Sequence, residues 1–170
     1  MQKIIVSKPF DMKDKTIKRI RWCCYVALAL CALWGILYFS NIIRSLFGYD
    51  EWPIRRINWS EHRAYKIGLL VVYSLSIAAM IGICVKVAIN ILKGLRENTV
   101  FPKNNVKLLF WFVAVDFLYL LAFNNLRVLW DGQTVFMLQH NNFVTPFFLL
   151  FFAFMYKIAA DAVEENNLTV

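Results

Sequence analysis

Residues 86–116 read KVAINILKGLRENTVFPKNNVKLLFWFVAVD, and the rest of the chain is arranged around them. The stretch contains the end of one apolar segment, a basic turn and the start of the next apolar segment. Pro102 is tolerated at a first helical position, so we expect the second helix to begin near it. The pattern predicts two consecutive antiparallel helices joined at residues 93–107.

The composition of the whole chain favours a membrane environment. Of its 170 residues, 60% are hydrophobic and 18% are charged. A soluble domain is usually about half apolar. The apolar residues also occur in long blocks, which is typical of segments that face lipid.

Four of these blocks are long enough to cross a bilayer as helices, because about 20 apolar residues span the hydrocarbon core. A basic, mostly polar arm at residues 1–21 precedes the first block. We therefore predict one all-α integral membrane domain over residues 1–170, a four-helix bundle with a small extracytoplasmic loop cap. The predicted spans cover about residues 22–43, 67–92, 104–123 and 143–163.

Two local patterns add detail to this bundle. Small residues spaced four apart favour close helix packing, so we expect the faces carrying Ala27, Cys31 and Gly35 and carrying Ala78 and Gly82 to meet other helices. In the last loop, an Asp-Gly pair at residues 131–132 lies between two short apolar runs, a pattern that predicts a β-hairpin.

The distribution of Lys and Arg predicts the orientation. With both termini in the cytoplasm, the inner side holds more than twice as many Lys and Arg residues as the outer side. The formal charge of +8 therefore reflects a membrane flank rather than a nucleic-acid surface. No helix-turn-helix or aromatic-basic RNA motif is present, so we expect no direct nucleic-acid binding.

Lys86 and Asp116 are the charged residues that lie deepest in the two apolar segments around the turn. By helical rise, each lies on the order of 10 Å from the lysine that marks its end of the turn. Charges inside hydrocarbon usually pair or line a cavity. Three interpretations remain open: an intramembrane polar pair, a lysine that reaches the interface while Asp116 is protonated or hydrogen-bonded, and a proton or ion relay.

Signatures of catalysis and metal binding are absent from the sequence. There is no His-Glu-x-x-His, no Gly-x-Ser-x-Gly and no phosphate-binding glycine loop. His62 and His140 lie in outer loops without ligand spacing, and the four cysteines lie in apolar segments. We therefore expect no enzyme activity, no cofactor and no metal site.

Short motifs at the turn and at the end of the chain resemble those of a family of small bacterial four-span inner-membrane proteins, domain of unknown function 2975. At the turn they are Leu92-x-x-Leu95, Thr99-Val-Phe101 and Asn105-Val-Lys-Leu108; at the end, the motif is Glu165-Asn-Asn-Leu-Thr-Val170. The family-like residues singled out as a cytoplasmic motif are Thr99, Phe101, Asn105, Leu168, Thr169 and Val170.

The resemblance implies a location in the bacterial cytoplasmic membrane and a regulatory or sensory role. Relatives are often encoded beside a small helix-turn-helix regulator, which implies a cytoplasmic partner of that kind. The alternative function is a small transporter or channel subunit that works as a homo-oligomer. The basic turn and the acidic tail can either pair with one another or form a docking surface; their charged residues are Lys93, Arg96, Lys103, Lys107, Asp161, Glu164 and Glu165.

Overall fold

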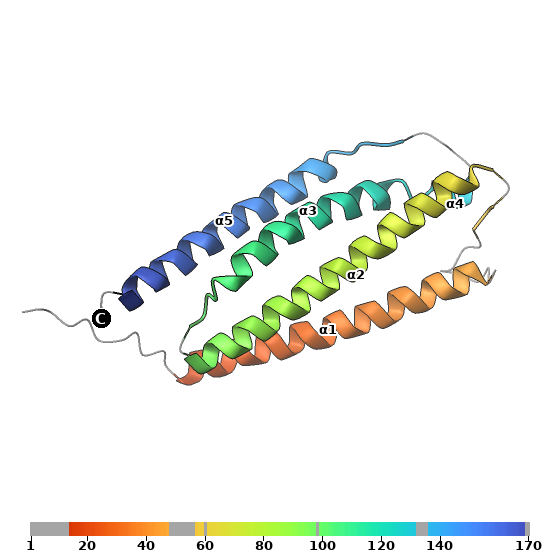
Figure 1. Ribbon diagram of the computed structural model, residues 1–170. Coiled ribbons are helices and arrows are strands. Elements are labelled where there is room, and N and C mark those ends of the chain that lie inside the picture. Colours follow the sequence, from red (N-terminus) through yellow and green to blue (C-terminus); the bar gives the residue numbers. More distant parts are fainter. Residues whose placement is uncertain (1–13, 48–56, 60, 98, 132–135, 169–170) are drawn as a thin grey trace, which may run out of the picture.

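The computed structural model describes residues 14–47, 57–59, 61–97, 99–131 and 136–168. Within these ranges the chain is helical and contains no β-strand. Four long helices run side by side along one direction (Figure 1). They are α1 (Asp14–Leu46), α2 (Arg63–Gly94), α3 (Asn104–Asn124) and α5 (Asn141–Leu168), with short elements η1 (Leu95–Glu97) and α4 (Val128–Asp131) in the connections.

Each of the four long helices is long enough and apolar enough to cross a membrane. The shortest, α3, has 21 residues, and at 1.5 Å per residue it extends about 31 Å, close to the thickness of a bilayer core. The helices also expose many large apolar side chains: on α5, for example, Phe147 is 67% exposed and Phe152 is 63% exposed. The chain is therefore a multi-pass membrane protein by length and composition, and the predicted all-α four-helix architecture is confirmed.

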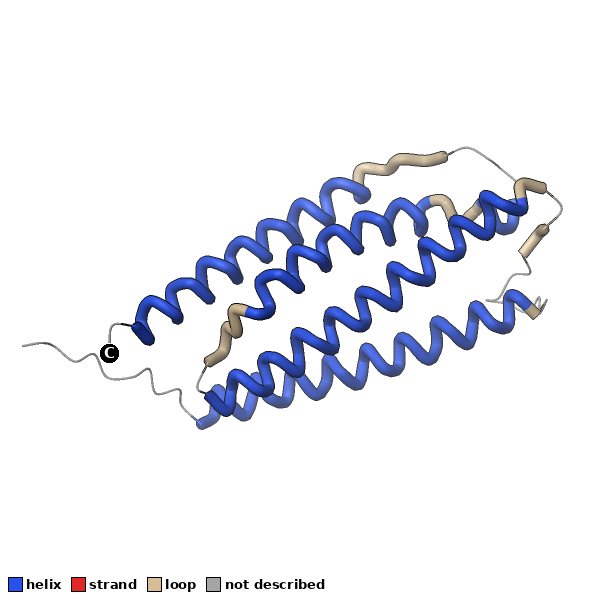
Figure 2. Tube along the Cα trace, viewed as in Figure 1, coloured by secondary structure: helices blue, strands red, loops and turns tan. Residues whose placement is uncertain are grey.

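Consecutive long helices make the extensive contacts: α1 packs on α2, α2 on α3, and α3 on α5. The four helices therefore form a row in chain order, which the tube view also shows (Figure 2). We call its two ends the turn end, where η1 connects α2 to α3 and α5 finishes, and the cap end, where residues 57–59 and α4 lie.

Helix α1 contacts its neighbour through a narrow seam with a spacing of three and four residues. The less exposed residues from its middle onward are Cys24, Leu28, Cys31, Gly35, Tyr38, Ile42 and Ser45. A Cβ atom on Gly35 would lie 3.4 Å from Ile81 Cδ1 of α2. Cys31 and Gly35 therefore lie in the helix contact as expected, whereas Ala27, the third residue of the predicted face, is exposed.

The prediction for the second small-residue face is wrong. Ala78 and Gly82 are both exposed, and a Cβ atom on Gly82 would meet nothing within 4 Å. Helix α2 is apolar on every side, so small residues on it do not by themselves identify the face that packs.

The turn between α2 and α3 is tight because Gly94 lies directly against Thr99 and Pro102. Gly94 is buried, Thr99 donates its backbone N–H to the Gly94 carbonyl at 2.8 Å, and a Cβ atom on Gly94 would lie 2.6 Å from the Thr99 carbonyl oxygen. Helix α3 begins at Asn104, two residues after Pro102. Any side chain at position 94 would push this turn open.

The described part of the cap end packs onto the bundle. Ile57 and Leu129 are buried, and Asn58 donates its backbone N–H to the Leu129 carbonyl at 3.0 Å. The predicted hairpin is wrong in its first half, because Val128–Asp131 is helical. Residues 132–135 lie outside the described residues.

Candidate functional site at the turn end

Asn105, in the first turn of α3, connects three helices through one side chain. It is fully buried, and its carbonyl oxygen accepts a hydrogen bond from the Asn90 side chain of α2 at 2.7 Å. Its amide nitrogen donates to the Val87 carbonyl of α2 at 3.3 Å and to the Tyr156 hydroxyl of α5 at 3.2 Å. The Tyr156 hydroxyl in turn donates to the Pro102 carbonyl at 3.3 Å. These five groups form the asparagine node.

Two further residues of the predicted motif lie beside the asparagine node. The Phe101 ring meets the Tyr156 ring edge to face, with centroids 5.4 Å apart. The Thr99 backbone N–H closes the turn by its hydrogen bond to the Gly94 carbonyl. The Thr99 hydroxyl also donates to the Glu97 carbonyl at 3.4 Å. Thr99, Phe101 and Asn105 therefore all help to fix the connection between α2 and α3.

The tail half of the predicted motif is only partly described. Leu168 is the last residue of α5, while Thr169 and Val170 lie outside the described residues.

A surface ion pair joins the start of α3 to the end of α5. The Lys103 ammonium donates to the Glu164 carboxylate at 2.5 Å, and both side chains are exposed. This hydrogen bond and the charge of Glu164 raise the pKa of Lys103 above its usual value. The basic turn and the acidic tail therefore do pair at one position, and Lys93, Arg96 and Lys107 remain exposed at the same end.

The structure does not bring Lys86 and Asp116 together. Asp116 is 6% exposed, whereas Lys86 is on the exposed face of α2. Among the described residues, Asp116 Oδ2 has no hydrogen-bond partner, and the two residues form no ion pair. The sequence placed both charges at a similar depth, but it could not show that Asp116 is buried while Lys86 is exposed.

Aromatic rings continue from Asp116 towards the cap end. Tyr119, one helical turn further along α3, stacks on Tyr73 of α2 with ring centroids 5.5 Å apart. The Tyr73 ring meets the Tyr38 ring of α1 edge to face, with centroids 5.4 Å apart. The Tyr38 hydroxyl lies 3.4 Å from Ser74 Oγ. Three tyrosine rings, one each from α1, α2 and α3, are therefore in contact on the cap-end side of the buried Asp116.

Asparagines also organise the cap end, a feature that the sequence analysis missed. Asn124 donates to the Asn142 side-chain oxygen at 2.8 Å, and that oxygen also accepts the Gln139 backbone N–H at 2.8 Å. Asn125 accepts the Met137 backbone N–H at 2.8 Å. The signal was present as two asparagine doublets that bracket this connection, because a polar side chain at a helix end satisfies free backbone groups.

The two histidines lie near the starts of α2 and α5. His62 precedes α2 with a positive φ of 50°, and both His62 and His140 are exposed. No group of three or more potential ligands from His, Cys, Asp and Glu occurs in the described ranges. The four cysteines are free thiols.

Comparison with protein-family models, with curated proteins and with solved structures finds no match for this chain. The resemblance to the four-span family therefore stays a prediction.

Proposed function

We propose that this chain is a non-enzymatic regulatory or sensory protein of a bacterial cytoplasmic membrane, acting through a soluble partner at its turn end. In this proposal both termini and the turn lie in the cytoplasm, where the excess of Lys and Arg favours them. The resemblance in the turn motifs supports a small helix-turn-helix regulator as the partner.

The observation that carries the proposal is the fixed geometry of the turn end. Gly94 closes the turn, the asparagine node joins α2, α3 and α5, and the Lys103–Glu164 pair joins α3 to α5. Conformational order that is already present does not have to be created on binding, so a fixed surface binds a partner at lower entropic cost. Lys93 and Arg96 project from this surface as exposed cations.

A co-purification experiment tests the proposal directly. The full chain and a Lys93→Glu/Arg96→Glu variant are each expressed from a genomic fragment that includes the neighbouring genes, and the membrane fraction is purified and tested for a co-purifying helix-turn-helix regulator. We expect the regulator to co-purify with the wild-type chain and its recovery to fall at least tenfold with the variant, since reversing charges in an interface is strongly unfavourable. The matched control is Arg127→Glu, an exposed charge at the cap end, which should retain the regulator. Equal recovery from all three chains contradicts the proposal.

One observation favours a second candidate, a small transporter or channel subunit. Asp116 is buried and its Oδ2 atom has no hydrogen-bond partner among the described residues, and ionisable residues at such positions often mark ion pathways. A row of four helices encloses no lumen, so this function needs a homo-oligomer. Ion flux into proteoliposomes that is lost with Asp116→Asn, together with an oligomer in detergent, would favour this candidate over the first.

A further inference from the structure

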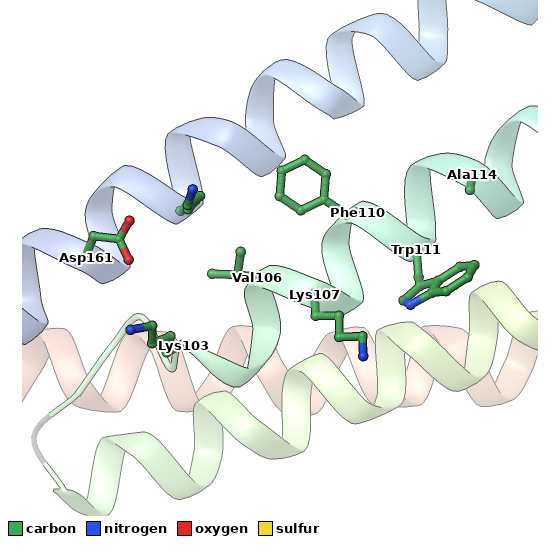
Figure 3. A pocket seen from close by; sticks show the side chains of 8 residues that line it. Lys103, Val106, Lys107, Phe110, Trp111, Ala114 and Asp161 are labelled. Atoms are coloured by element: carbon green, nitrogen blue, oxygen red, sulfur yellow. The ribbon is translucent and has the colours of Figure 1, made fainter.

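A groove of about 670 Å³ lies between the beginning of α3 and the end of α5. Figure 3 shows side chains of α3 and α5 around it, with Asp161 of α5 across from Lys103. Lys103, Lys107 and Lys157 line the groove towards the turn end, and Phe110, Trp111 and Ala114 line it towards the membrane interior. The lining thus changes from charged to apolar along the helix axis.

The charge available in this groove is positive. Lys103 is engaged with Glu164, but Lys107 and Lys157 form no ion pair with a described residue and both are exposed. Asp161 is the carboxylate among the residues that line the groove. Lys107 of α3 and Lys157 of α5 are therefore each available to bind an anion.

The two free lysines also lie at the edge of the apolar segments. The charge-free part of α3 begins directly after Lys107, and the charge-free part of α5 ends directly before Lys157. This is the level at which a bilayer changes from hydrocarbon to phosphate groups. Basic pockets between membrane helices at this level bind anionic lipid headgroups.

We propose that this groove binds one anionic phospholipid with a hydroxyl-bearing headgroup, such as phosphatidylglycerol. The ammonium groups of Lys107 and Lys157 hold the phosphate, and an acyl chain lies along Phe110 and Trp111. Asp161 accepts a hydrogen bond from a headgroup hydroxyl, which a choline headgroup cannot supply. The site does not depend on a soluble partner or on which leaflet faces the cytoplasm.

Native mass spectrometry of the full chain in detergent tests the site. Phosphatidylglycerol, phosphatidylcholine and phosphatidylethanolamine with identical acyl chains are titrated separately. We expect one phosphatidylglycerol to bind at least tenfold more tightly than either of the other two. Equal affinity for phosphatidylglycerol and phosphatidylcholine overturns the site, and equal or tighter binding of phosphatidylethanolamine overturns its preference for an anionic lipid.

A matched pair of variants locates the binding. Lys107→Gln/Lys157→Gln should weaken phosphatidylglycerol binding about tenfold or more, because each lysine near a phosphate contributes on the order of 1 kcal/mol. Lys93→Gln/Arg96→Gln removes the same charge from exposed positions at the same end that do not line the groove, and it should leave binding unchanged. An equal loss in both variants overturns the assignment to this groove.

A third variant keeps the test decisive if the double lysine variant does not fold. Asp161→Asn removes the carboxylate that repels the phosphate and retains an acceptor oxygen, so it should strengthen phosphatidylglycerol binding several-fold.

A fluorescence measurement in liposomes places the lipid beside Trp111. Brominated phosphatidylglycerol should quench the tryptophan fluorescence more than brominated phosphatidylcholine does, and Trp111→Phe should abolish that difference. Unchanged affinity with Asp161→Asn, or a difference that survives Trp111→Phe, contradicts the proposal. Excess inorganic phosphate should not displace the lipid, and displacement would show that the groove binds free phosphate.

Discussion

Asn105 concentrates the polar contacts of three helices in one fully buried amide. Replacing it with Ala leaves the Asn90 side chain without its acceptor and the Tyr156 hydroxyl without its donor. Interhelical hydrogen bonds in membrane proteins average about 0.6 kcal/mol, and buried groups left unpaired cost more, about 1–3 kcal/mol. We expect Asn105→Ala to lower the free energy of unfolding by about 1–2 kcal/mol, measured by thermal unfolding in detergent.

The adjacent Asn104 is exposed and provides the control for this substitution. Asn104→Ala should change the unfolding temperature little. If both variants unfold at the wild-type temperature, the asparagine node does not stabilise the turn end.

Gly94 leaves no room for a side chain, because a Cβ atom would lie 2.6 Å from the Thr99 carbonyl oxygen and 2.9 Å from Pro102 Cγ. We expect Gly94→Ala to destabilise the protein by about 1–3 kcal/mol, the usual range for overpacking. Gly82→Ala, at an open position on the same helix, should be neutral or slightly stabilising because alanine favours a helix. Thermal unfolding of the two variants side by side checks this contrast, and equal melting temperatures would contradict it.

Asp116 gives a prediction opposite to the one that an intramembrane ion pair implies. A buried carboxyl group without a partner is costly, and an amide of nearly the same shape removes the possibility of a buried charge. We expect Asp116→Asn to be at least as stable as the wild type, and its effect to add independently to that of Lys86→Gln. A paired Asp116 would instead cost about 3–5 kcal/mol on substitution. A double-mutant cycle in detergent separates the two outcomes.

Helix α1 is held in the row by a single seam, so its packing should be sensitive to one position. Gly35 faces Ile81 of α2, whereas Ala32 is exposed. We expect Gly35→Leu to separate α1 from α2 and to expose Cys31 and Cys84 to a membrane-permeant maleimide. Ala32→Leu introduces a leucine at this exposed position of the same helix and should leave the labelling rate unchanged. Equal rates in both variants would show that the seam does not exist.

The sequence predicts the helices well and their contacts poorly, for a physical reason. Lys and Arg at the ends of charge-free runs mark where lipid begins and ends, so the positions of the spans are readable. The face with which each span packs cannot be predicted in this way, because α2 and α3 are apolar all round and lipid is as apolar as a neighbouring helix. Thus Ala78 and Gly82 were assigned to a contact that they do not make, and an ion pair between Lys86 and Asp116 stayed one of three open interpretations.

Part of the candidate site was predicted from the sequence. Thr99, Phe101 and Asn105 stood out as a pattern, but their partners did not, because Asn90 and Tyr156 lie 15 and 51 residues from Asn105 in the chain. A lone asparagine in an apolar helix is a signal for an interhelical hydrogen bond, and Asn90 carried that signal. The groove between α3 and α5 was not predictable, since it depends on the spacing of two helix surfaces.

At the scale of the whole molecule, the orientation can be tested at two exposed arginines. Arg96 lies at the turn end and Arg127 at the cap end. In a cysteine-free background, we expect Arg127→Cys to react with an impermeant maleimide applied outside intact cells, and Arg96→Cys to react only after permeabilisation. Reversed accessibility would move the proposed partner surface to the outside of the cell.

The single-file order of the helices has a consequence for how the molecule responds to its surroundings. A closed bundle shields its centre, but here α2 and α3 expose large apolar side chains, as do α1 and α5 at the edges of the row. Helix α1 has 33 residues and α3 has 21, so α1 is about 18 Å longer at 1.5 Å per residue, and its charged first two turns account for most of the difference. The apolar lengths of the neighbours are therefore similar, and a row of such helices can follow a change in bilayer thickness by tilting together.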